Sequence, residues 1–172
     1  MTFCTSYLTR LAQNLTAPEN CQAEYNRGFA SVVDAHLAML AYAPVYGATC
    51  LRDPGTGAYC YANVITNASN PSSAHFYFLP LNKTLPGTTI PNCGPCLQQT
   101  MDLYQAATAD RTQPISRTYA SAAEQVNAVC GPDYVNKTLA EATVPSAAAL
   151  GRSVTWLGAA MPLLLGSIVW LV

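Results

Sequence analysis

The stretch CGPCLQQTMDLYQAATADRTQPISRTYASAAEQVNAVCGP, residues 93–132, carries the clearest structural signal in this chain. Its apolar residues recur every three or four positions in two runs, namely Leu97, Met101, Tyr104 and Ala107, and then Tyr119, Ala122, Ala123, Val126 and Val129. This spacing predicts two helices, because residues three and four apart share one helical face. The short link at residues 110–116 contains a proline, and it predicts that the two helices pack as an antiparallel pair.

An antiparallel pair brings the start of its first helix beside the end of its second. Cys96 begins the first helix and Cys130 ends the second, so we predict a Cys96–Cys130 disulfide. The Gly131-Pro132 pair directly after Cys130 is a typical helix stop. Spacing alone does not determine how cysteines connect, so this pairing is a hypothesis.

Two further disulfides follow as hypotheses from cysteine positions. Cys50 and Cys60 are equidistant from Gly55, in an Asp-Pro-Gly turn sequence, and could face each other across a hairpin. Cys4 and Cys21 form the third hypothetical pair.

The remaining elements are predicted from periodicity and from proline positions. Apolar residues at helical spacing predict helices over residues 5–16 and 23–42, the second ending at Pro44. Residues 58–66 and 74–79 are aromatic and β-branched enough for two strands of a hairpin, and proline-rich coil follows them. The predicted fold is mainly α: a small disulfide-stapled helical domain with a short β-hairpin, proline-rich loops and a hydrophobic C-terminal tail helix.

The last seventeen residues, WLGAAMPLLLGSIVWLV at 156–172, contain no charged residue. At about 1.5 Å per residue they reach only about 25 Å, short of the roughly 30 Å of a membrane's hydrocarbon core. Three small residues at 146–148 and a spacer at 147–155 precede them. This order is the signal for a glycosylphosphatidylinositol (GPI) anchor, whose tail is cleaved off. We expect attachment at Ser146 and a membrane as partner through the lipid, with a membrane-spanning or tail-anchored C-terminal helix as the alternative.

The composition divides the chain into three parts. We expect an extracellular disulfide-bonded helical domain at 1–137, an Ala/Ser/Thr/Pro linker with the attachment region at 138–155, and the hydrophobic signal or membrane segment at 156–172. The first residues show neither the basic start nor the apolar run of a signal peptide. We therefore expect that the natural N-terminus lies further upstream.

Several features together favour a secreted glycoprotein. Four sequons for N-glycosylation occur, at Asn14, Asn67, Asn82 and Asn136. The seven cysteines are expected to form disulfides, because the secretory compartment is oxidising. Only 10% of the residues are charged and the net charge is −1, which argues against nucleic acid as a partner.

Cys93-Gly94-Pro95-Cys96 is the one stretch that resembles catalytic chemistry. A Cys-x-x-Cys dithiol at a helix start is typical of thioredoxin-like oxidoreductases, where the helix N-terminus lowers the pKa of the first thiol. That interpretation needs a βαβ context, whereas here proline-rich coil precedes the motif and helices follow it. A Cys96–Cys130 bond would also remove the dithiol.

No other catalytic or metal-binding pattern stands out. His36 and His75 are far apart, and no zinc-binding spacing or Gly-x-Ser-x-Gly motif occurs, so we expect no metal, no cofactor and no enzymatic activity. Five aromatic residues gather in the middle of the chain: Tyr59, Tyr61, Phe76, Tyr77 and Phe78. They could line a carbohydrate or peptide surface, but we favour an ordinary role in the core.

Four segments in order resemble a family of fungal surface proteins: CLRDPGTGAYCYANVITNAS, FYFLPLNKTLPG, CGPCLQQTMDLY and TYASAAEQVNAVCGPDYVN. The resemblance covers about residues 21–136. That family carries a domain of unknown function and typically ends in a GPI signal. The resemblance implies a secreted, disulfide-bonded, mostly helical domain, and it brings no catalytic residues to this chain.

These inferences lead to one expectation and two alternatives. We expect a non-enzymatic, GPI-anchored glycoprotein at the outer face of a fungal plasma membrane or in its cell wall, with wall glycans or proteins as possible partners. The first alternative is a surface thiol–disulfide oxidoreductase that uses Cys93 and Cys96. The second is a glycan- or peptide-binding module that uses the aromatic middle segment.

Overall fold

The structure is a computed structural model, and it describes residues 2–143. Its helices are α1 (Thr2–Leu15), α2 (Gln22–Asn26), α3 (Ala30–Leu40), α4 (Tyr42–Thr49), α5 (Cys60–Ile65), the 3₁₀ helix η1 (Pro71–Leu81), α6 (Pro95–Ala107) and α7 (Ile115–Cys130). Within residues 2–143 no strand forms, apart from an isolated antiparallel bridge between Arg52 and Tyr59. The prediction of a mainly α domain is thus confirmed. The predictions for Ser146 and for residues 156–172 lie outside the described residues.

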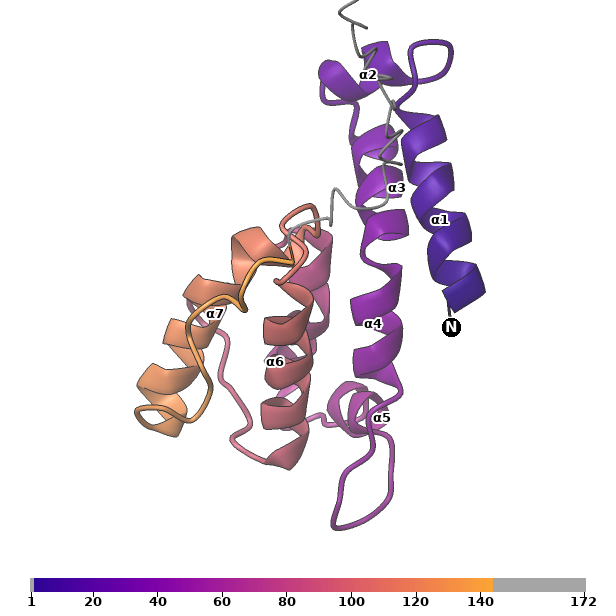
Figure 1. The fold of residues 1–172 in the computed structure, drawn as a ribbon. Helices are drawn as coiled ribbons and strands as arrows, with labels where there is room; N and C mark the ends of the chain where they lie inside the picture. The colour runs from indigo at the N-terminus through magenta and orange to yellow at the C-terminus, as the bar shows by residue number, and fades with distance from the viewer. Residues whose placement is uncertain (1, 144–172) are drawn as a thin grey trace, which may run out of the picture.

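Helices α4, α6, α7 and η1 enclose the core, and α1, α2 and α3 extend from it as an arm (Figure 1). Tyr104, Met101 and Tyr119 are fully buried between α6 and α7, and Phe76 and Leu79 of η1 pack against them. In the arm, α1 lies along α3, and α2 caps the end of the pair farthest from the core (Figure 1). Between residues 2 and 143, no helix has both the length and the apolar character that crossing a bilayer requires.

The predicted helix pair of the last third is confirmed as α6 and α7. Both helices bury the periodic apolar face that predicted them, including Leu97 and Met101 on α6 and Ala122 and Val126 on α7. Gly131 ends α7 with a φ of 109°, a backbone conformation that residues with a side chain rarely adopt. The helix predicted over residues 5–16 is likewise present as α1.

The single helix predicted over residues 23–42 is wrong, because the structure divides this region into three helices. Gly28 adopts a φ of 73° between α2 and α3, which breaks the first part of the predicted helix. Pro44 does not end a helix but lies in the first turn of α4. Proline is tolerated there, since the first N–H groups of a helix have no partner within it.

The predicted β-hairpin is also wrong. Residues 58–66 contain α5, and residues 74–79 lie within η1. η1 buries Phe76, Tyr77, Leu79 and Pro80, whereas Phe78 is exposed. This spacing suits a helix rather than a strand, which would bury alternate residues. Packing against α6 and α7 therefore overrides the strand propensity of the aromatic residues.

Candidate functional site

Both cysteines of the Cys-Gly-Pro-Cys motif are bonded to distant partners. Cys60 is bonded to Cys96, with 5.4 Å between their Cα atoms, and Cys93 is bonded to Cys130, with 5.5 Å between theirs. Both distances lie in the normal range for a disulfide. The first bond ties α5 to the start of α6, and the second ties the coil before α6 to the end of α7. The motif therefore holds three helices together in this structure.

The predicted Cys96–Cys130 pair is wrong, because Cys130 is bonded to Cys93, the other cysteine of the motif. The start of α6 does lie beside the end of α7, as the antiparallel arrangement requires. Cys93, in the coil before the helix, reaches Cys130, while Cys96 in the first turn of α6 reaches α5. Periodicity located the two helix ends, but it did not indicate which way the first turn of α6 faces.

The predicted Cys50–Cys60 pair is wrong because of the register of the turn between them. The bridge joins Arg52 to Tyr59, and the amide of Cys60 donates to the carbonyl oxygen of Leu51 at 2.9 Å. In this register Cys60 is opposite Leu51 rather than Cys50. A shift of one residue turns side chains to the opposite face of a paired segment. Cys50 is consequently exposed and unbonded, whereas Cys60 is buried.

The predicted Cys4–Cys21 pair does not form either. Cys4 lies in the first turn of α1, and Cys21 follows the far end of that helix. A helix of this length separates its ends by about 20 Å, whereas bonded cysteines need Cα atoms within about 7 Å. Cys4, Cys21 and Cys50 are the free cysteines of the described residues.

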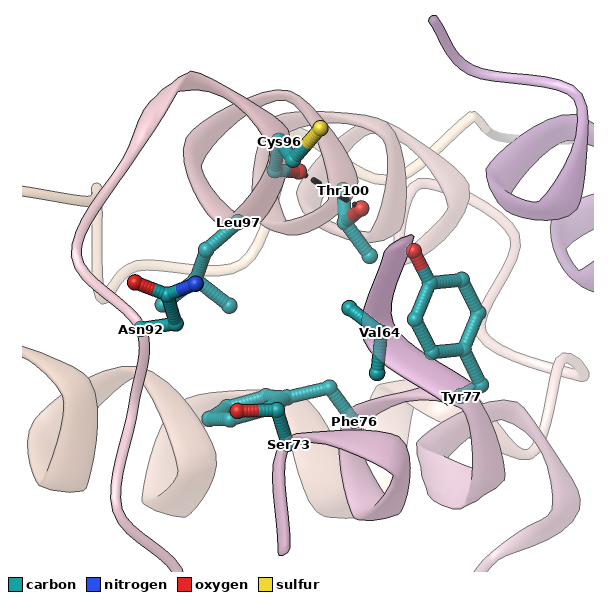
Figure 2. Close-up of a pocket in the computed structure, with 8 residues that line it drawn as sticks. All are labelled: Val64, Ser73, Phe76, Tyr77, Asn92, Cys96, Leu97 and Thr100. Atoms are coloured by element: carbon teal, nitrogen blue, oxygen red, sulfur yellow. Dashed lines mark hydrogen bonds between the residues drawn. The ribbon is translucent and has the colours of Figure 1, made fainter. Parts of the chain in front are cut away.

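A small cavity lies beside the Cys96 end of α6 (Figure 2). Its lining comprises Val64, Ser73, Phe76, Tyr77, Asn92, Cys96, Leu97 and Thr100. Its volume of about 30 Å³ is enough for a water molecule and too small for an organic substrate. The Thr100 hydroxyl donates to the Cys96 carbonyl oxygen at 2.8 Å, so its proton is used in a hydrogen bond within α6.

Burial favours the neutral form of Tyr77, which lines this cavity, and of its neighbour Tyr104. Burial raises the pKa of Tyr77, and a hydrogen bond with Thr100 offsets part of the rise. Burial also raises the pKa of Tyr104 far above its ordinary value, with a contribution from nearby Tyr77. The Tyr104 hydroxyl has no hydrogen-bond partner among residues 2–143. These phenols suit a packed interior rather than proton transfer near neutral pH.

The aromatic residues of the middle segment divide between core and surface. Phe76 and Tyr77 are buried, and Tyr61 packs edge-on against Tyr77 with ring centres 4.8 Å apart. Tyr59 is exposed, but the Arg52 guanidinium covers its ring at 4.2 Å. The core role that we favoured is confirmed for Phe76 and Tyr77.

The two histidines lie on different elements and in different surroundings. His36 of α3 packs against the Tyr25 ring at 4.9 Å, and burial lowers the pKa of its imidazole. His75 of η1 lies 3.3 Å from the Thr89 hydroxyl. Among the residues that the structure describes, no three His, Cys, Asp or Glu side chains form a group that could hold a metal ion.

All four sequon asparagines lie at accessible positions. Asn14 and Asn136 are exposed, and Asn67 and Asn82 are partly exposed. The Asn136 side-chain oxygen accepts from both the amide and the hydroxyl of Thr138, at 3.0 and 2.7 Å. The polypeptide itself therefore does not bar a glycan at any of these positions.

The segment after α7, residues 131–143, runs back along α6 and α7 as a strap. Near its start, the Tyr134 hydroxyl donates to the Gly94 carbonyl oxygen at 2.7 Å. The next residue, Val135, is buried, and the side-chain amide of Asn127 forms hydrogen bonds with both of its backbone groups. Leu139 packs against the core further along. The sequence composition predicts a linker from residue 138, so the packing of Leu139 against the core was not predicted.

The strap ends at the turn between α6 and α7. The Ala140 amide donates to the Thr108 hydroxyl at 2.9 Å, and Arg111 donates to the Ala140 carbonyl oxygen at 2.7 Å. The Thr143 amide and hydroxyl both donate to the Ala109 carbonyl oxygen, at 3.0 and 3.2 Å. The last described residue, Thr143, therefore lies beside the α6–α7 turn at one edge of the domain.

Comparison with known proteins places the chain in a family. No curated protein and no solved structure matches it. One protein family, defined by a domain of unknown function called DUF7729, matches residues 1–139, which comprise most of the chain and nearly all of the described fold. The chain therefore belongs to the DUF7729 family.

Proposed function

We propose that the protein is a non-enzymatic glycoprotein that a GPI anchor holds at the outer face of a fungal plasma membrane or in its cell wall. The observation that carries this proposal is the order of small residues, spacer and charge-free apolar run over residues 146–172. The expected attachment residue is Ser146, and the expected partners are the membrane and components of the wall.

The described domain supports the proposal in two ways. Two disulfides staple a small helical fold, which is typical of proteins in an oxidising compartment. Four sequons are accessible on its surface, so glycans could solvate a domain that carries few charges.

The use of the cysteines supports a structural role over a catalytic one. A thiol–disulfide oxidoreductase would cycle a bond between Cys93 and Cys96. Here each of these cysteines is bonded to another element of the core. Reducing these bonds would remove the covalent links from α5 and α7 to the start of α6. Each catalytic cycle would then destabilise the core.

The anchor is tested by expressing the whole gene in a fungal host and treating intact cells with a phosphatidylinositol-specific phospholipase. We expect release of the protein into solution. The triple variant Ser146→Leu, Ala147→Leu and Ala148→Leu should lose surface display, because GPI attachment requires small residues at these positions. Ser153→Leu, in the spacer, is the matched control and should keep it. Persistence of residues 156–172 in the mature protein would contradict the proposal.

A further inference from the structure

Helix α1 exposes an apolar strip along one side of the arm. Phe3, Tyr7 and Leu11 are 74%, 50% and 37% exposed, and they recur every four positions, so they share one face of the helix. The Phe3 and Tyr7 rings stack with their centres 6.4 Å apart. The other side of α1 buries Ala12 and packs along α3 (Figure 1). Apolar surface that is exposed as a continuous patch typically marks a binding site.

A sequon asparagine lies in this same surface. Tyr7, Arg10, Leu11 and Asn14 together line a groove of about 370 Å³. Asn14 begins the sequence Asn-Leu-Thr, which is an acceptor for an N-glycan. Its side chain is exposed and has no hydrogen-bond partner within residues 2–143. The groove therefore contains the attachment point of a ligand that the chain itself would carry.

The geometry of the helix directs a glycan on Asn14 along the groove. The Cα–Cβ bond of a helical residue tilts toward the N-terminus, so its side chain covers the preceding turn of the helix. For Asn14 the preceding turn contains Arg10 and Leu11, and Tyr7 follows one turn further along. The seven residues from Tyr7 to Asn14 correspond to about 10 Å along the axis. A pair of sugars attached at Asn14 would thus lie over Arg10 and Leu11 and point toward Tyr7.

The chemistry of the groove suits the first two sugars of an N-glycan, which are N-acetylglucosamine. Each of these sugars has an apolar face of C–H groups and an acetyl methyl group, which can pack on the Tyr7 ring and against Leu11. The hydroxyl and acetamide oxygens of the sugars accept hydrogen bonds, and the guanidinium of Arg10 offers five N–H donors. The groove thus pairs an apolar floor with a donor at its edge.

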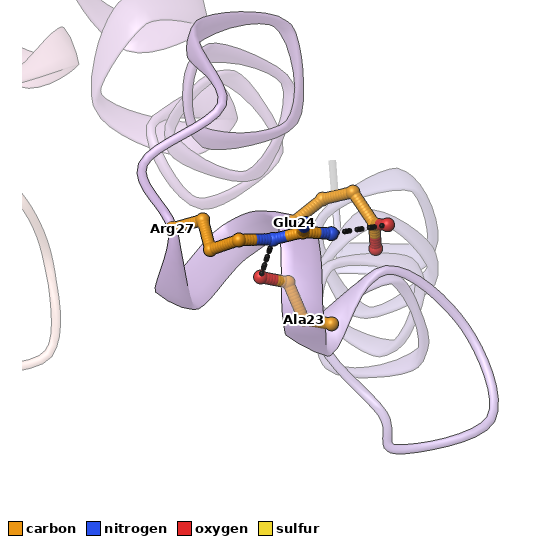
Figure 3. Close-up of polar contacts among 3 residues, drawn as sticks. All are labelled: Ala23, Glu24 and Arg27. Carbon is orange, nitrogen blue, oxygen red and sulfur yellow. Dashed lines mark hydrogen bonds and ion pairs between the residues drawn. The ribbon is translucent and has the colours of Figure 1, made fainter.

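Arg10 is available for this contact, unlike the other arginine of the arm. Arg27 donates to the Ala23 carbonyl oxygen at 3.2 Å and pairs with Glu24 at 3.1 Å (Figure 3). The Arg27 guanidinium also lies over the Phe29 ring. Arg10 is exposed, and its side chain has no partner among the residues that the structure describes. It is the only charged residue of α1, so no carboxylate on the helix competes for it.

We propose that the exposed face of α1 is a docking site for the N-glycan attached to Asn14. Tyr7 and Leu11 lie under its first two sugars, and Arg10 donates hydrogen bonds to them. The inference rests on the proposed function, because it needs glycosylation in the secretory lumen. The docked glycan removes apolar surface of α1 from water and thereby stabilises the arm.

The test measures how fast an endoglycosidase cuts between the two N-acetylglucosamine residues of each glycan in the native protein. The whole gene is expressed in a fungal host that adds high-mannose glycans, and peptide mass spectrometry follows each site during digestion. Asn136 is the control within the same chain, because it is exposed and lies on the strap rather than on α1. A glycan that is docked in about nine of ten molecules should be cut about tenfold more slowly at Asn14 than at Asn136. In denatured protein the two rates should be similar.

Substitutions in the groove separate docking from steric crowding near Asn14. Tyr7→Ser and Arg10→Gln should each raise the rate of cleavage at Asn14 severalfold. Tyr46→Ser and Arg117→Gln are the matched controls and should leave this rate unchanged. Tyr46 of α4 is 42% exposed, Arg117 of α7 is exposed without a side-chain partner in the described part of the chain, and both lie outside the groove.

The outcomes distinguish this inference from the proposed function. Equal rates at Asn14 and Asn136 in the native protein would overturn the inference, and so would an Asn14 rate that Tyr7→Ser leaves unchanged. An unmodified Asn14 beside a glycosylated Asn136 would overturn it as well, while leaving the anchor intact. Unmodified asparagine at all four sequons would instead contradict the secretory route on which the proposed function depends.

Discussion

Cys93 is bonded to Cys130, although Cys96 is the cysteine that begins α6. The bond joins the coil before α6 to the last turn of α7 and closes a loop of 37 residues. Cys60–Cys96 closes a loop of nearly the same length, 36 residues, on the other side of the α6 N-terminus. The two disulfides together fix one end of the helical core from both sides.

Removing either disulfide should destabilise the domain by a similar amount. Loops of this length imply about 2–4 kcal/mol for each bond, through the entropy of the unfolded chain. We expect that Cys93→Ala with Cys130→Ala, and Cys60→Ala with Cys96→Ala, each lower the free energy of unfolding in urea by this amount. Cys50→Ala, which removes an exposed free thiol, is the control and should change it little. An unchanged stability of both double variants would contradict the assigned pairs.

Two buried tyrosines should respond oppositely to loss of the hydroxyl. The Tyr119 hydroxyl donates to the Asn136 carbonyl oxygen, whereas the Tyr104 hydroxyl has no partner among residues 2–143. Tyr119→Phe should cost about 1 kcal/mol of unfolding free energy, and Tyr104→Phe should be neutral or stabilising. Both are measured by urea unfolding at neutral pH, and a larger loss for Tyr104→Phe would show that the assignment is wrong.

Stability should fall in strong alkali because of Tyr119. Burial raises the pKa of Tyr119 to about 12, from 10.0 for the free side chain, with a contribution from Asp102. Between these values the unfolded chain releases the phenolic proton and the folded chain keeps it. Stability from this group is therefore complete below pH 10 and is lost as the pH rises toward 12. Unfolding free energies measured between pH 9 and 12 should decline less steeply for Tyr119→Phe.

The end of the strap should depend on the Thr108 hydroxyl. This oxygen accepts from the Ala140 amide at 2.9 Å, so Thr108→Val leaves that amide without its partner. We expect faster hydrogen exchange at Ala140 and Thr143 in the variant. Val135, which is held separately by Asn127, is the internal control and should remain protected. Unchanged exchange at Ala140 would mean that the strap is held by other contacts.

Glycan mapping should distinguish the four sequons from a neighbouring asparagine. Enzymatic removal of N-glycans converts each occupied asparagine to aspartate, which peptide mass spectrometry detects. We expect this conversion at the exposed Asn14 and Asn136. Asn70 is followed by Pro71 and should remain unmodified. Unmodified asparagine at all four sequons would argue against passage through the secretory lumen.

Helical periodicity predicted the part of the fold that packs most regularly. α6 and α7 bury one face each, so Met101 and Val126 lie where their spacing indicates. The same approach failed for η1, because Phe76 and Tyr77 have strand propensity but are packed by neighbours distant in sequence. A local pattern contains no information about those neighbours.

The disulfides illustrate a second limit. The antiparallel helix pair correctly brought Cys130 near the motif, but the choice between Cys93 and Cys96 depends on a rotation about the axis of α6. Cys50 is free because the register of the turn differs by one residue from the predicted one, which places Cys60 opposite Leu51. The part of the strap from residue 138 was predicted as a linker because its sequence shows no helical or strand periodicity. It is held instead through its backbone groups, which bond to side chains such as Arg111.

The central claim is the lipid anchor, and the most direct measurement is mass spectrometry of the C-terminal peptide of the mature protein from a fungal host. The account predicts a peptide that ends at or near Ser146 and carries ethanolamine phosphate linked to a glycan. A mature chain that retains residues 156–172 would contradict it, and would favour a membrane-spanning or tail-anchored helix instead.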